Sequence, residues 1–469
     1  MKRSKNSKQK FSTKITPIIG LQWGDEGKGK GVARIASGLS VQDLIVRFQG
    51  GNNAGHTIWY EGDCYVFHLI PSGVFGKAQV HLGAGMVINP GALLLEAKKI
   101  PKKISFLNRM SVSPHAVLTI PTHLLMDSVS EKSKGKKKIG STGKGISPSY
   151  TDLTLRRALR VGDIFYGDFK KKYAALRAEH IETLNKVFGH KVSAVELKAN
   201  ENNFWQGVKF LQSLKIMESA EIVEQAILGE HKIIAEGAQG ALLDVRFGHY
   251  PFVTSSHTIA AGVATGLGIP PAYVGGAIGI TKAYTTKVGE GPFPTELGGE
   301  KSAVWCRDKR SADEQSKFPN PSPQSRDPFE VGIALRRAGN EIGATTGRLR
   351  RTGWLDLPLL KYTIKMNRAE ELVLTKLDVL NGFKEIKVCV AYKVNGKRTE
   401  KIPFDLSRVK VEPIYRSFPL WKGKLSDYGI KLPKEALEYV KFLEQTLNTK
   451  IIYVGTGPEE HHAVERYWS

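Results

Sequence analysis

The chain has 469 residues, 41% of them hydrophobic and 24% charged, which excludes a wholly disordered chain and a small disulfide-stabilised protein. Its unusual property is charge, because 69 Lys and Arg outnumber 45 Asp and Glu and leave a formal net charge of +24. Such an excess attracts anions, whether nucleic acids, anionic membranes or phosphorylated small molecules.

The cysteines indicate a reducing compartment. Cys64, Cys306 and Cys389 are odd in number and widely spaced, which fits free thiols better than a disulfide framework or a zinc site. No apolar run approaches the ~18 residues of a membrane helix, and the basic N-terminus lacks the apolar core of a secretory signal. We therefore expect a cytoplasmic protein.

Two stretches hold much of the positive charge. Residues 1–14 contain six Lys and Arg and no acid, and residues 131–144 contain six Lys and one Glu. The first stretch is predicted to be a disordered tail, because it cannot bury enough apolar surface to offset the entropy lost on ordering. A solvated extension is the simpler interpretation, and a tether to RNA or a membrane is the alternative. The remaining residues, 15–469, are expected to form one α/β domain.

Short apolar, β-branched runs recur along the chain, and each ends in a Gly-rich turn. Such strands alternating with helical stretches predict an α/β fold with a large, mostly parallel sheet covered by helices on both faces, and ligands bind beyond the carboxyl ends of its strands. Residues 299–330 are polar and rich in Pro and Ser, which predicts a long surface loop. The predicted strands span 15–21, 43–48, 232–237, 275–284, 370–378 and 450–457, and the helical stretches span 169–187 and 202–228.

The first motif, GLQWGDEGKGKG at 20–31, follows a strand and opens a helix. Residues 24–30 satisfy the spacing G-x-x-x-x-G-K, although Gly31 replaces the Ser or Thr that normally holds magnesium. Backbone N–H groups in such a loop and the start of the helix bind phosphate. Asp25 would repel phosphate unless it binds magnesium or takes a proton. A purely structural Gly turn is the alternative.

The second motif, QGGNNAGHT at 49–57, offers amide and hydroxyl groups and one histidine. His56 is a candidate general acid or phosphate contact, and a solvated loop histidine is the alternative. The third motif, 141–163, contains Lys144 and places Arg156, Arg157 and Arg160 on a predicted helix, where their guanidinium groups suit phosphate. A solvated basic helix face is the alternative.

Three further segments carry small polar groups. Residues 236–266 include Gln239 and Thr254, which are residue types that contact bases and phosphates. Residues 343–356 combine consecutive Thr, Gly and Arg, including Arg351, in a loop suited to a carboxylate or a phosphate. In TKLD (375–378), Asp378 can accept two hydrogen bonds from guanine, and a helix N-cap is the alternative. GTGP (455–458) also follows an apolar strand.

Together these strings resemble the adenylosuccinate synthetase family from about Ile18 to Gly457. The resemblance is densest in QWGDEGKGK, GGNNAGHT, EGAQGALLD, YPFVTSSHT, KAYTTKVGEGPFPTEL, GATTGR, RRTGWLD and TKLDVLNG. It implies a P-loop-like GTP-binding architecture with inserted subdomains. It also implies GTP-driven ligation of L-aspartate to IMP with magnesium, giving adenylosuccinate, GDP and phosphate, by a homodimer.

The resemblance also implies residue roles. Asp25 would take a proton from the purine and bind the metal, His56 would assist transfer of the γ-phosphoryl group to the purine oxygen, Gln239 would be catalytic, and the carbonyl of Gly55 would bind magnesium. Arg156 would reach the IMP site of the partner subunit. The implied GTP contacts are Gly24, Asp25, Glu26, Gly27, Lys28, Gly29, Lys30, Gly55, His56, Thr57, Arg350, Lys376, Leu377, Asp378, Gly455, Thr456 and Gly457. The implied IMP contacts are Asp25, Lys28, Asn53, Ala54, Gly55, His56, Thr142, Arg156, Gln239, Thr254 and Arg348. The implied aspartate contacts are Val288, Ala344, Thr345, Thr346, Gly347, Arg348, Leu349 and Arg350.

Some residues depart from the family pattern and leave alternatives open. One alternative is a paralogous synthetase that acts on another purine nucleotide such as dGMP, although such relatives tend to lose the aspartate found here at position 25. A nonspecific basic nucleic-acid-binding protein is an alternative of another class, but no recognisable nucleic-acid-binding motif is present. A simple GTPase is a third. The departing residues are Lys144, Arg246, Phe247, His257, Leu349 and Gly455.

Overall fold

The structure of the chain is a computed structural model that describes residues 14–135, 138–343, 347–429, 431–457, 459 and 462–465. Most of the predicted basic tail, residues 1–13, therefore lies outside the described residues. Within the described residues, no helix is long and apolar enough to cross a membrane.

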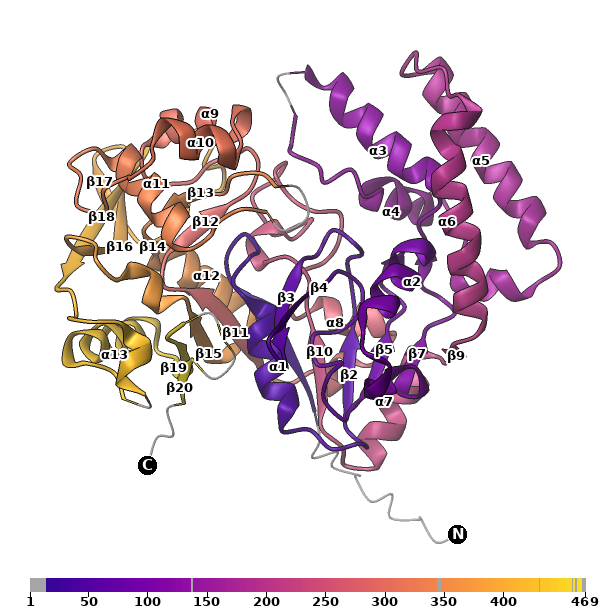
Figure 1. The fold of residues 1–469 in the computed structure, drawn as a ribbon, viewed down its shortest axis with the longest axis horizontal. Helices are drawn as coiled ribbons and strands as arrows, with labels where there is room; N and C mark the ends of the chain where they lie inside the picture. The colour runs from indigo at the N-terminus through magenta and orange to yellow at the C-terminus, as the bar shows by residue number, and fades with distance from the viewer. Residues whose placement is uncertain are drawn as a thin grey trace, which may run out of the picture.

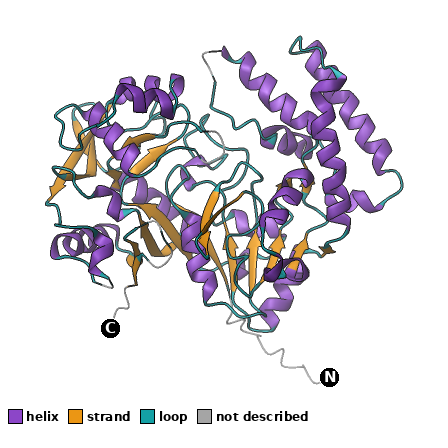
Figure 2. Cartoon of the chain, in the orientation of Figure 1, coloured by secondary structure: helices purple, strands orange, loops and turns teal. Residues whose placement is uncertain are grey.

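The six predicted strands are all present and lie next to one another in one ten-stranded sheet, in the order β19-β15-β11-β1-β10-β2. Every neighbouring pair in this group is parallel. Figure 2 shows these strands side by side with helices around them. The fold class predicted from the sequence is confirmed. The six strands are β1 (Ile15–Gly20), β2 (Leu44–Arg47), β10 (Ile233–Glu236), β11 (Ala277–Lys282), β15 (Ala369–Thr375) and β19 (Lys450–Gly455).

Shorter strands extend the sheet at both edges. Beyond β2 the sheet continues with three parallel strands, and beyond β19 it ends with one antiparallel strand. These strands are β5 (Gln79–Leu82), β7 (Met110–Val112), β9 (Lys215–Ile216) and β20 (Ala463–Glu465).

Side chains of the central strands alternate between two buried faces, as a sheet covered on both sides requires. Ile15 and Ile19 of β1 pack with α7 (Ser219–Leu228) and α8 (Gly262–Leu267), whereas Ile18 packs with α1 (Lys28–Ser37). Since both faces are covered, polar groups concentrate at the ends of the strands.

A helical region lies beside the β5–β7–β9 edge, with α3 to α6 together in Figure 1. The predicted helix at 169–187 is confirmed as α5 (Phe169–Lys186). The predicted helix at 202–228 is wrong, because α6 ends at Gln212 and the short strand β9 separates it from α7. The helices of this region are α2 (Pro90–Lys99), α3 (Pro121–Ser133), α4 (Ile146–Thr154), α5 and α6 (Ala194–Gln212).

Arg156, Arg157 and Arg160 are not on a helix as predicted. The helix α4 ends at Thr154, and Arg156 has a left-handed backbone with φ of 61°. Arg157 donates instead to Asp152 and Glu179 at 2.8 Å each. The chain therefore turns at Arg156 and exposes it.

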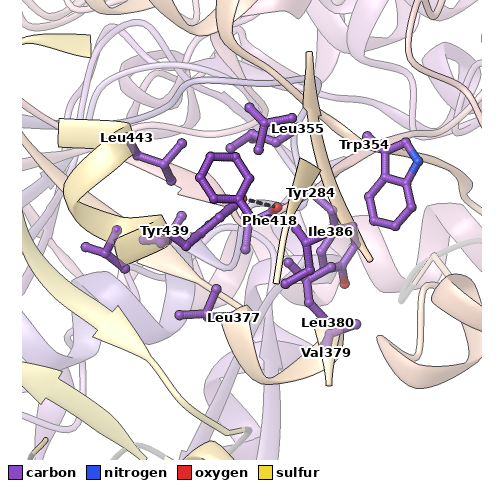
Figure 3. Packing of buried hydrophobic residues seen from close by; sticks show 14 of the residues in the cluster. Tyr284, Trp354, Leu355, Leu377, Val379, Leu380, Ile386, Phe418, Tyr439 and Leu443 are labelled. Carbon is purple, nitrogen blue, oxygen red and sulfur yellow. Dashed lines mark hydrogen bonds between the residues drawn. The ribbon is translucent and has the colours of Figure 1, made fainter. Parts of the chain in front are cut away.

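A large hydrophobic core packs around the β14–β18 region, which lies away from the helices α3 to α6 in Figure 1. Figure 3 shows the packing of its side chains. There Phe418 packs edge-on against Tyr439, with 5.3 Å between ring centroids, and the Tyr439 hydroxyl donates to the carbonyl of Ala283 at 3.0 Å. A small sheet supplies part of this core. Its strands are β14 (Leu355–Asp356), β16 (Ile386–Val394), β17 (Lys397–Thr399) and β18 (Val411–Phe418), and the helices here are α12 (Leu357–Asn367) and α13 (Lys434–Leu447).

The predicted surface loop at 299–330 is wrong for most of its length. It contains two helices, α9 (Gly299–Asp308) and α10 (Ser311–Lys317), and runs into α11 (Pro328–Ala338). Three aromatic side chains and a buried ion pair between Glu314 and Arg336 hold these helices together. The aromatic side chains are Trp305, Phe318 and Phe329.

Three short two-stranded sheets complete the fold. They are formed by β3 (His56–Tyr60) with β4 (Asp63–Phe67), β6 (Val87–Ile88) with β8 (Val117–Leu118), and β12 (Thr285–Lys287) with β13 (Arg351–Gly353).

Candidate active site

One cavity of about 1090 Å³ lies at the carboxyl ends of the central strands. The loops after β1, β2, β10, β15 and β19 all contribute to its wall, together with Val288 and Glu290 after β12, α4 and the 339–350 segment. The structure therefore brings the six predicted motifs together, although they are spread over more than 400 residues of chain. This placement follows from the parallel sheet, in which all these strands end on the same side.

The cavity wall contains most of the residues predicted for the site. Seven lie outside it: Glu26, Arg156, Gly347, Leu349, Leu377, Asp378 and Thr456. Ala344, Thr345 and Thr346 lie outside the described residues. Those in the wall are Gly24, Asp25, Gly27, Lys28, Gly29, Lys30, Asn53, Ala54, Gly55, His56, Thr57, Thr142, Gln239, Thr254, Val288, Arg348, Arg350, Lys376, Gly455 and Gly457.

The conformation of the loop after β1 is held by a glutamate of the loop itself, Glu26. Glu26 is fully buried, and its Oε1 accepts from the backbone N–H groups of Gln22 at 3.0 Å and Gly24 at 2.8 Å. Its Oε2 accepts from Lys28 at 2.6 Å. The carboxylate is thus turned into the protein and shapes the loop around the cavity.

The helix α1 begins at the cavity. Its N-cap Gly27 is left-handed and, within the described chain, has no side-chain cap, and residues 27–31 line the cavity. The first N–H groups of an α-helix have no intrahelical partner and carry partial positive charge, which makes this end suited to phosphate. Lys30 of the same turn donates to the carbonyl of Gly457 at 2.7 Å and so joins the loops after β1 and β19.

Asp25 is paired with an arginine from the other side of the cavity. Its Oδ1 accepts from Arg350 at 2.8 Å, and Arg350 also donates to Glu341 at 2.6 Å. Burial opposes the charge of Arg350, but Asp25 and Glu341 outweigh that effect and raise the pKa of the guanidinium. Arg350 therefore stays charged and connects the carboxylate of Asp25 with a second, buried carboxylate.

His56 is held by a buried glutamate that the sequence reasoning missed. Its Nδ1 lies 2.5 Å from Oε1 of Glu236, which also accepts from the hydroxyl of Ser72 at 2.7 Å. Because a carboxylate only accepts, Nδ1 carries the proton and Nε2 is the nitrogen left for a ligand. Burial lowers the pKa of His56, and the Glu236 carboxylate opposes that shift. The signal in the sequence is the position of Glu236. It is an acidic residue at the carboxyl end of the predicted strand, directly before GAQG.

Two predicted residues hold buried polar atoms without a hydrogen-bond partner among the described residues. Both amide atoms of Gln239 are of this kind, as is Oδ1 of Asp378, and burial raises the pKa of that carboxyl group. Buried polar atoms in proteins normally have partners, so such atoms indicate a ligand. Gln239, Asp25 and Lys376 also have left-handed backbones, with φ of 56°, 59° and 58°. Strained backbone of this kind clusters at functional sites.

The predicted aspartate loop is fixed at its base. Arg348 donates to the carbonyls of Gly140 at 2.9 Å and Ser141 at 3.1 Å, which ties this loop to the segment that enters α4. Leu349 is 2% exposed and packs inward. The departure from the family pattern at position 349 therefore falls on a side chain that is turned away from the cavity.

A buried cluster of His123, Asp152 and His180 lies behind α4. The two Nε2 atoms lie 2.7 and 2.9 Å from the same oxygen of Asp152. The N–H of Ile120 donates to Nδ1 of His123 at 3.0 Å, so Nε2 of His123 carries a proton and donates to Asp152. The cluster is thus a hydrogen-bonded network that positions α4, and its protonated Nε2 does not suit a metal ion.

Comparison with known proteins identifies the family of the chain. The model of the adenylosuccinate synthetase family matches residues 17–464. The adenylosuccinate synthetase of Christiangramia forsetii is 44% identical over 453 residues, covering 96% of this chain and 99% of that protein. That of Phocaeicola vulgatus is 41% identical over 458 residues, covering 97% and 99%.

Solved structures show the same fold. The structure of fully ligated adenylosuccinate synthetase from Plasmodium falciparum aligns with a TM-score of 0.83 at 33% identity, covering 97% of this chain and 100% of that one. The succinoaminodeoxyadenylate synthetase of cyanophage S-2L, solved with dGMP and dATP, aligns with a TM-score of 0.54 at 17% identity, covering 97% and 95%. At that identity the likeness concerns the fold alone.

Proposed function

The chain belongs to the adenylosuccinate synthetase family, which joins L-aspartate to IMP at the expense of GTP, and on that premise we propose how its cavity performs the reaction. The observation that carries the proposal is the pairing of Asp25 with Arg350 opposite the Glu236-held His56 in one cavity. These groups match a reaction that needs a base, a phosphoryl-transfer site and an anion site.

The reaction proceeds in two steps. Asp25 takes the proton from the purine ring nitrogen, and the purine 6-oxygen attacks the γ-phosphorus of GTP, which breaks the bond to GDP. The amine of L-aspartate then attacks the purine carbon and phosphate leaves with the oxygen, taking up the proton that the amine loses. Asp25 afterwards releases its proton to solvent. With Nδ1 donating to Glu236, His56 can donate from Nε2 to the transferring group only in its doubly protonated form, which the Glu236 carboxylate favours. Gln239 supplies an amide whose two polar atoms are buried without a partner among the described residues.

Each substrate is assigned to one part of the cavity. GTP phosphates lie at the start of α1, and guanine lies against Asp378 and Lys376. IMP lies against Asn53, Thr142 and Thr254, and L-aspartate lies against the 343–350 loop. The GTP phosphates and the carboxylates of L-aspartate thereby meet positively charged groups, as positioning and charge neutralisation require.

The residues present fit a magnesium ion. Asp25 offers a carboxylate that is 28% exposed and lines the cavity, and Gly55 offers a backbone carbonyl in the same wall. Carboxylate and carbonyl oxygens are the ligands that Mg²⁺ prefers. Magnesium bound there would neutralise charge on the transferring phosphoryl group.

Arg156 supports a homodimer in which each subunit completes the other's IMP site. The side chain is exposed and lies outside the wall of its own cavity. This position fits a contact from Arg156 to the IMP of a second copy of the chain. The left-handed turn at Arg156 presents this side chain to such a partner.

The test is phosphate release measured with GTP and with IMP and L-aspartate added singly and together. We expect release only when both are present, and about 10²–10⁴-fold slower release in Asp25→Asn, the range a positioned base contributes. GTP binding should persist in that variant. Near-wild-type turnover in Asp25→Asn, release without aspartate, or a preference for dGMP over IMP would contradict the proposal.

A further inference from the structure

Glu341 lies at the start of the predicted aspartate loop and accepts hydrogen bonds from four side chains. The residue is completely buried. Its Oε1 accepts from Lys282 at 3.0 Å, from Lys376 at 2.8 Å and from the hydroxyl of Tyr284 at 2.5 Å. Its Oε2 accepts from Arg350 at 2.6 Å. We refer to these five residues as the Glu341 network.

The network joins loops that the proposed function assigns to different substrates. Lys376 belongs to the guanine segment after β15, and it also donates to the carbonyl of Gly339 at 2.7 Å. Arg350 belongs to the aspartate loop and continues to Asp25 in the loop after β1. One buried carboxylate thus lies between the GTP base, the aspartate loop and the proposed base of the reaction.

The backbone around Glu341 fixes the same loop. The N–H of Arg350 donates to the carbonyl of Glu341 at 3.0 Å, and that of Gly343 donates to the carbonyl of Arg348 at 2.8 Å. Ile342 and Leu349 pair as an antiparallel bridge between these bonds. Both the main chain and the carboxylate of Glu341 therefore hold the end of the loop, and Arg350 is bound by both.

The charges around position 341 indicate why this position needs a carboxylate. Three cations, Lys282, Lys376 and Arg350, converge on Glu341, and burial alone would penalise the charges of Lys282 and Arg350. An amide of the same shape would direct an N–H₂ group at one of these donors, because every partner of Glu341 donates. Lys282 is fully buried outside the cavity wall, whereas Lys376 and Arg350 line the cavity.

We propose that Glu341 is a positioning residue that holds Lys376 and Arg350 in place for GTP and L-aspartate and couples the two sites. The inference rests on the proposed function, since it takes the substrates of these two side chains from it. Glu341 acts through the two cations and does not line the cavity itself. IMP is held mainly by other loops, and Glu341 reaches it only indirectly, through Arg350 and Asp25.

The test is steady-state kinetics of Glu341→Gln, with each substrate varied in turn. We expect the KM values for GTP and for L-aspartate to rise about tenfold or more, in line with loss of charge-assisted hydrogen bonds, and the KM for IMP to stay within about twofold. A buried carboxyl outside the cavity gives the matched control. Asp356 caps α12 and accepts from Tyr392, so Asp356→Asn should lower thermal stability and leave all three KM values unchanged.

A second variant separates positioning from simple neutralisation of Lys282. If Glu341 only compensated that buried charge, Lys282→Met combined with Glu341→Gln would restore the wild-type KM values. We expect the double variant to keep both raised values, and restoration would overturn the inference. An equal rise in all three KM values, or none, would overturn it as well. The wild type measured in parallel distinguishes the two proposals. If the wild-type protein forms no product that depends on IMP and L-aspartate, the proposed function is contradicted, and the role of Glu341 is not what failed.

Discussion

At the residue scale, several buried histidines are held neutral and should make stability depend on pH. Burial lowers the pKa of His81 to about 3, and that of His123 to about 4, from 6.5. As the pH falls below 6.5, the unfolded chain binds protons that the native protein does not, so the native state loses stability. Each such histidine contributes about 1.4 kcal/mol per pH unit between its two pKa values.

His81→Gln should therefore flatten the loss of stability between pH 6 and pH 4. His81 contacts the hydroxyls of Ser111 and Ser219, so the variant also loses some stability at pH 7. The quantity to compare is therefore the slope of the free energy of unfolding against pH. Urea unfolding at several pH values measures it. His115→Gln changes an exposed histidine and serves as the control. An unchanged slope in His81→Gln would contradict the assignment.

The Glu236–His56 pair makes a second prediction at this scale. Glu236→Gln keeps the shape of the side chain but removes the carboxylate that fixes the proton on Nδ1. We expect kcat to fall about 10- to 100-fold, the usual effect of losing a residue that orients a histidine, with smaller changes in KM. Ser72→Ala removes a neighbouring hydrogen bond to the same carboxylate and should cost much less. Equal losses in both variants would assign Glu236 a structural role only.

At the element scale, α9 and α10 depend on tertiary contacts more than on their own sequences. Glu314 of α10 binds Arg336 of α11 through both oxygens and also accepts from the indole N–H of Trp305 at 2.9 Å. Arg336 in turn donates to the carbonyl of Arg350 at 2.8 Å. These helices therefore support the segment that carries the aspartate loop.

Glu314→Gln should destabilise the protein by about 3–5 kcal/mol, because it leaves the guanidinium of Arg336 buried without its charge partner. Thermal and urea unfolding measure the loss. Asp313→Asn changes the neighbouring exposed carboxylate, which accepts from the N–H of Arg310, and should cost about 1 kcal/mol. A Glu314→Gln variant as stable as Asp313→Asn would show that the buried pair does not hold α10 in place.

The same elements show what the sequence can predict. The six strands were predictable because each is a short β-branched run before a Gly-rich turn, and a parallel sheet then places the motifs together. The helices at 299–317 were not predictable from the sequence. They are stabilised by contacts of Glu314 with Arg336 and of Trp305 with Phe329, which lie later in the chain. Glu236 and Glu341 were missed for a related reason. Their importance lies in partners that only the fold brings near. Glu236 begins the motif EGAQGALLD without any sign of its partner His56, and Glu341 stands just before the 343–356 motif.

At the scale of the whole molecule, the proposed dimer makes two defective variants complement each other. Asp25→Asn inactivates a subunit's own site, whereas Arg156→Leu inactivates the site of its partner. In a mixed dimer one site then carries both defects and the other carries neither. An equal mixture should recover about a quarter of the wild-type activity, since about half of the random dimers are mixed and each has one intact site.

Mixing Asp25→Asn with a His56→Asn variant provides the control. Both residues lie in the wall of the same chain's cavity, so every mixed dimer has two defective sites and no activity should return. No recovery in the Arg156→Leu mixture would contradict the shared site. Gel filtration of each variant confirms that the subunits still associate.

The hydrogen bond from Lys30 to Gly457 spans 427 positions of the chain and has a consequence for the making of the protein. During translation the phosphate loop after β1 is among the first parts to leave the ribosome, and the strand β19 that completes its surroundings is among the last. A nascent chain that ends before β19 lacks Gly455 and Gly457, which line the proposed GTP site. Contacts between such distant segments also form slowly. The proposed GTP site is therefore complete only after β19 has been made and has joined the sheet.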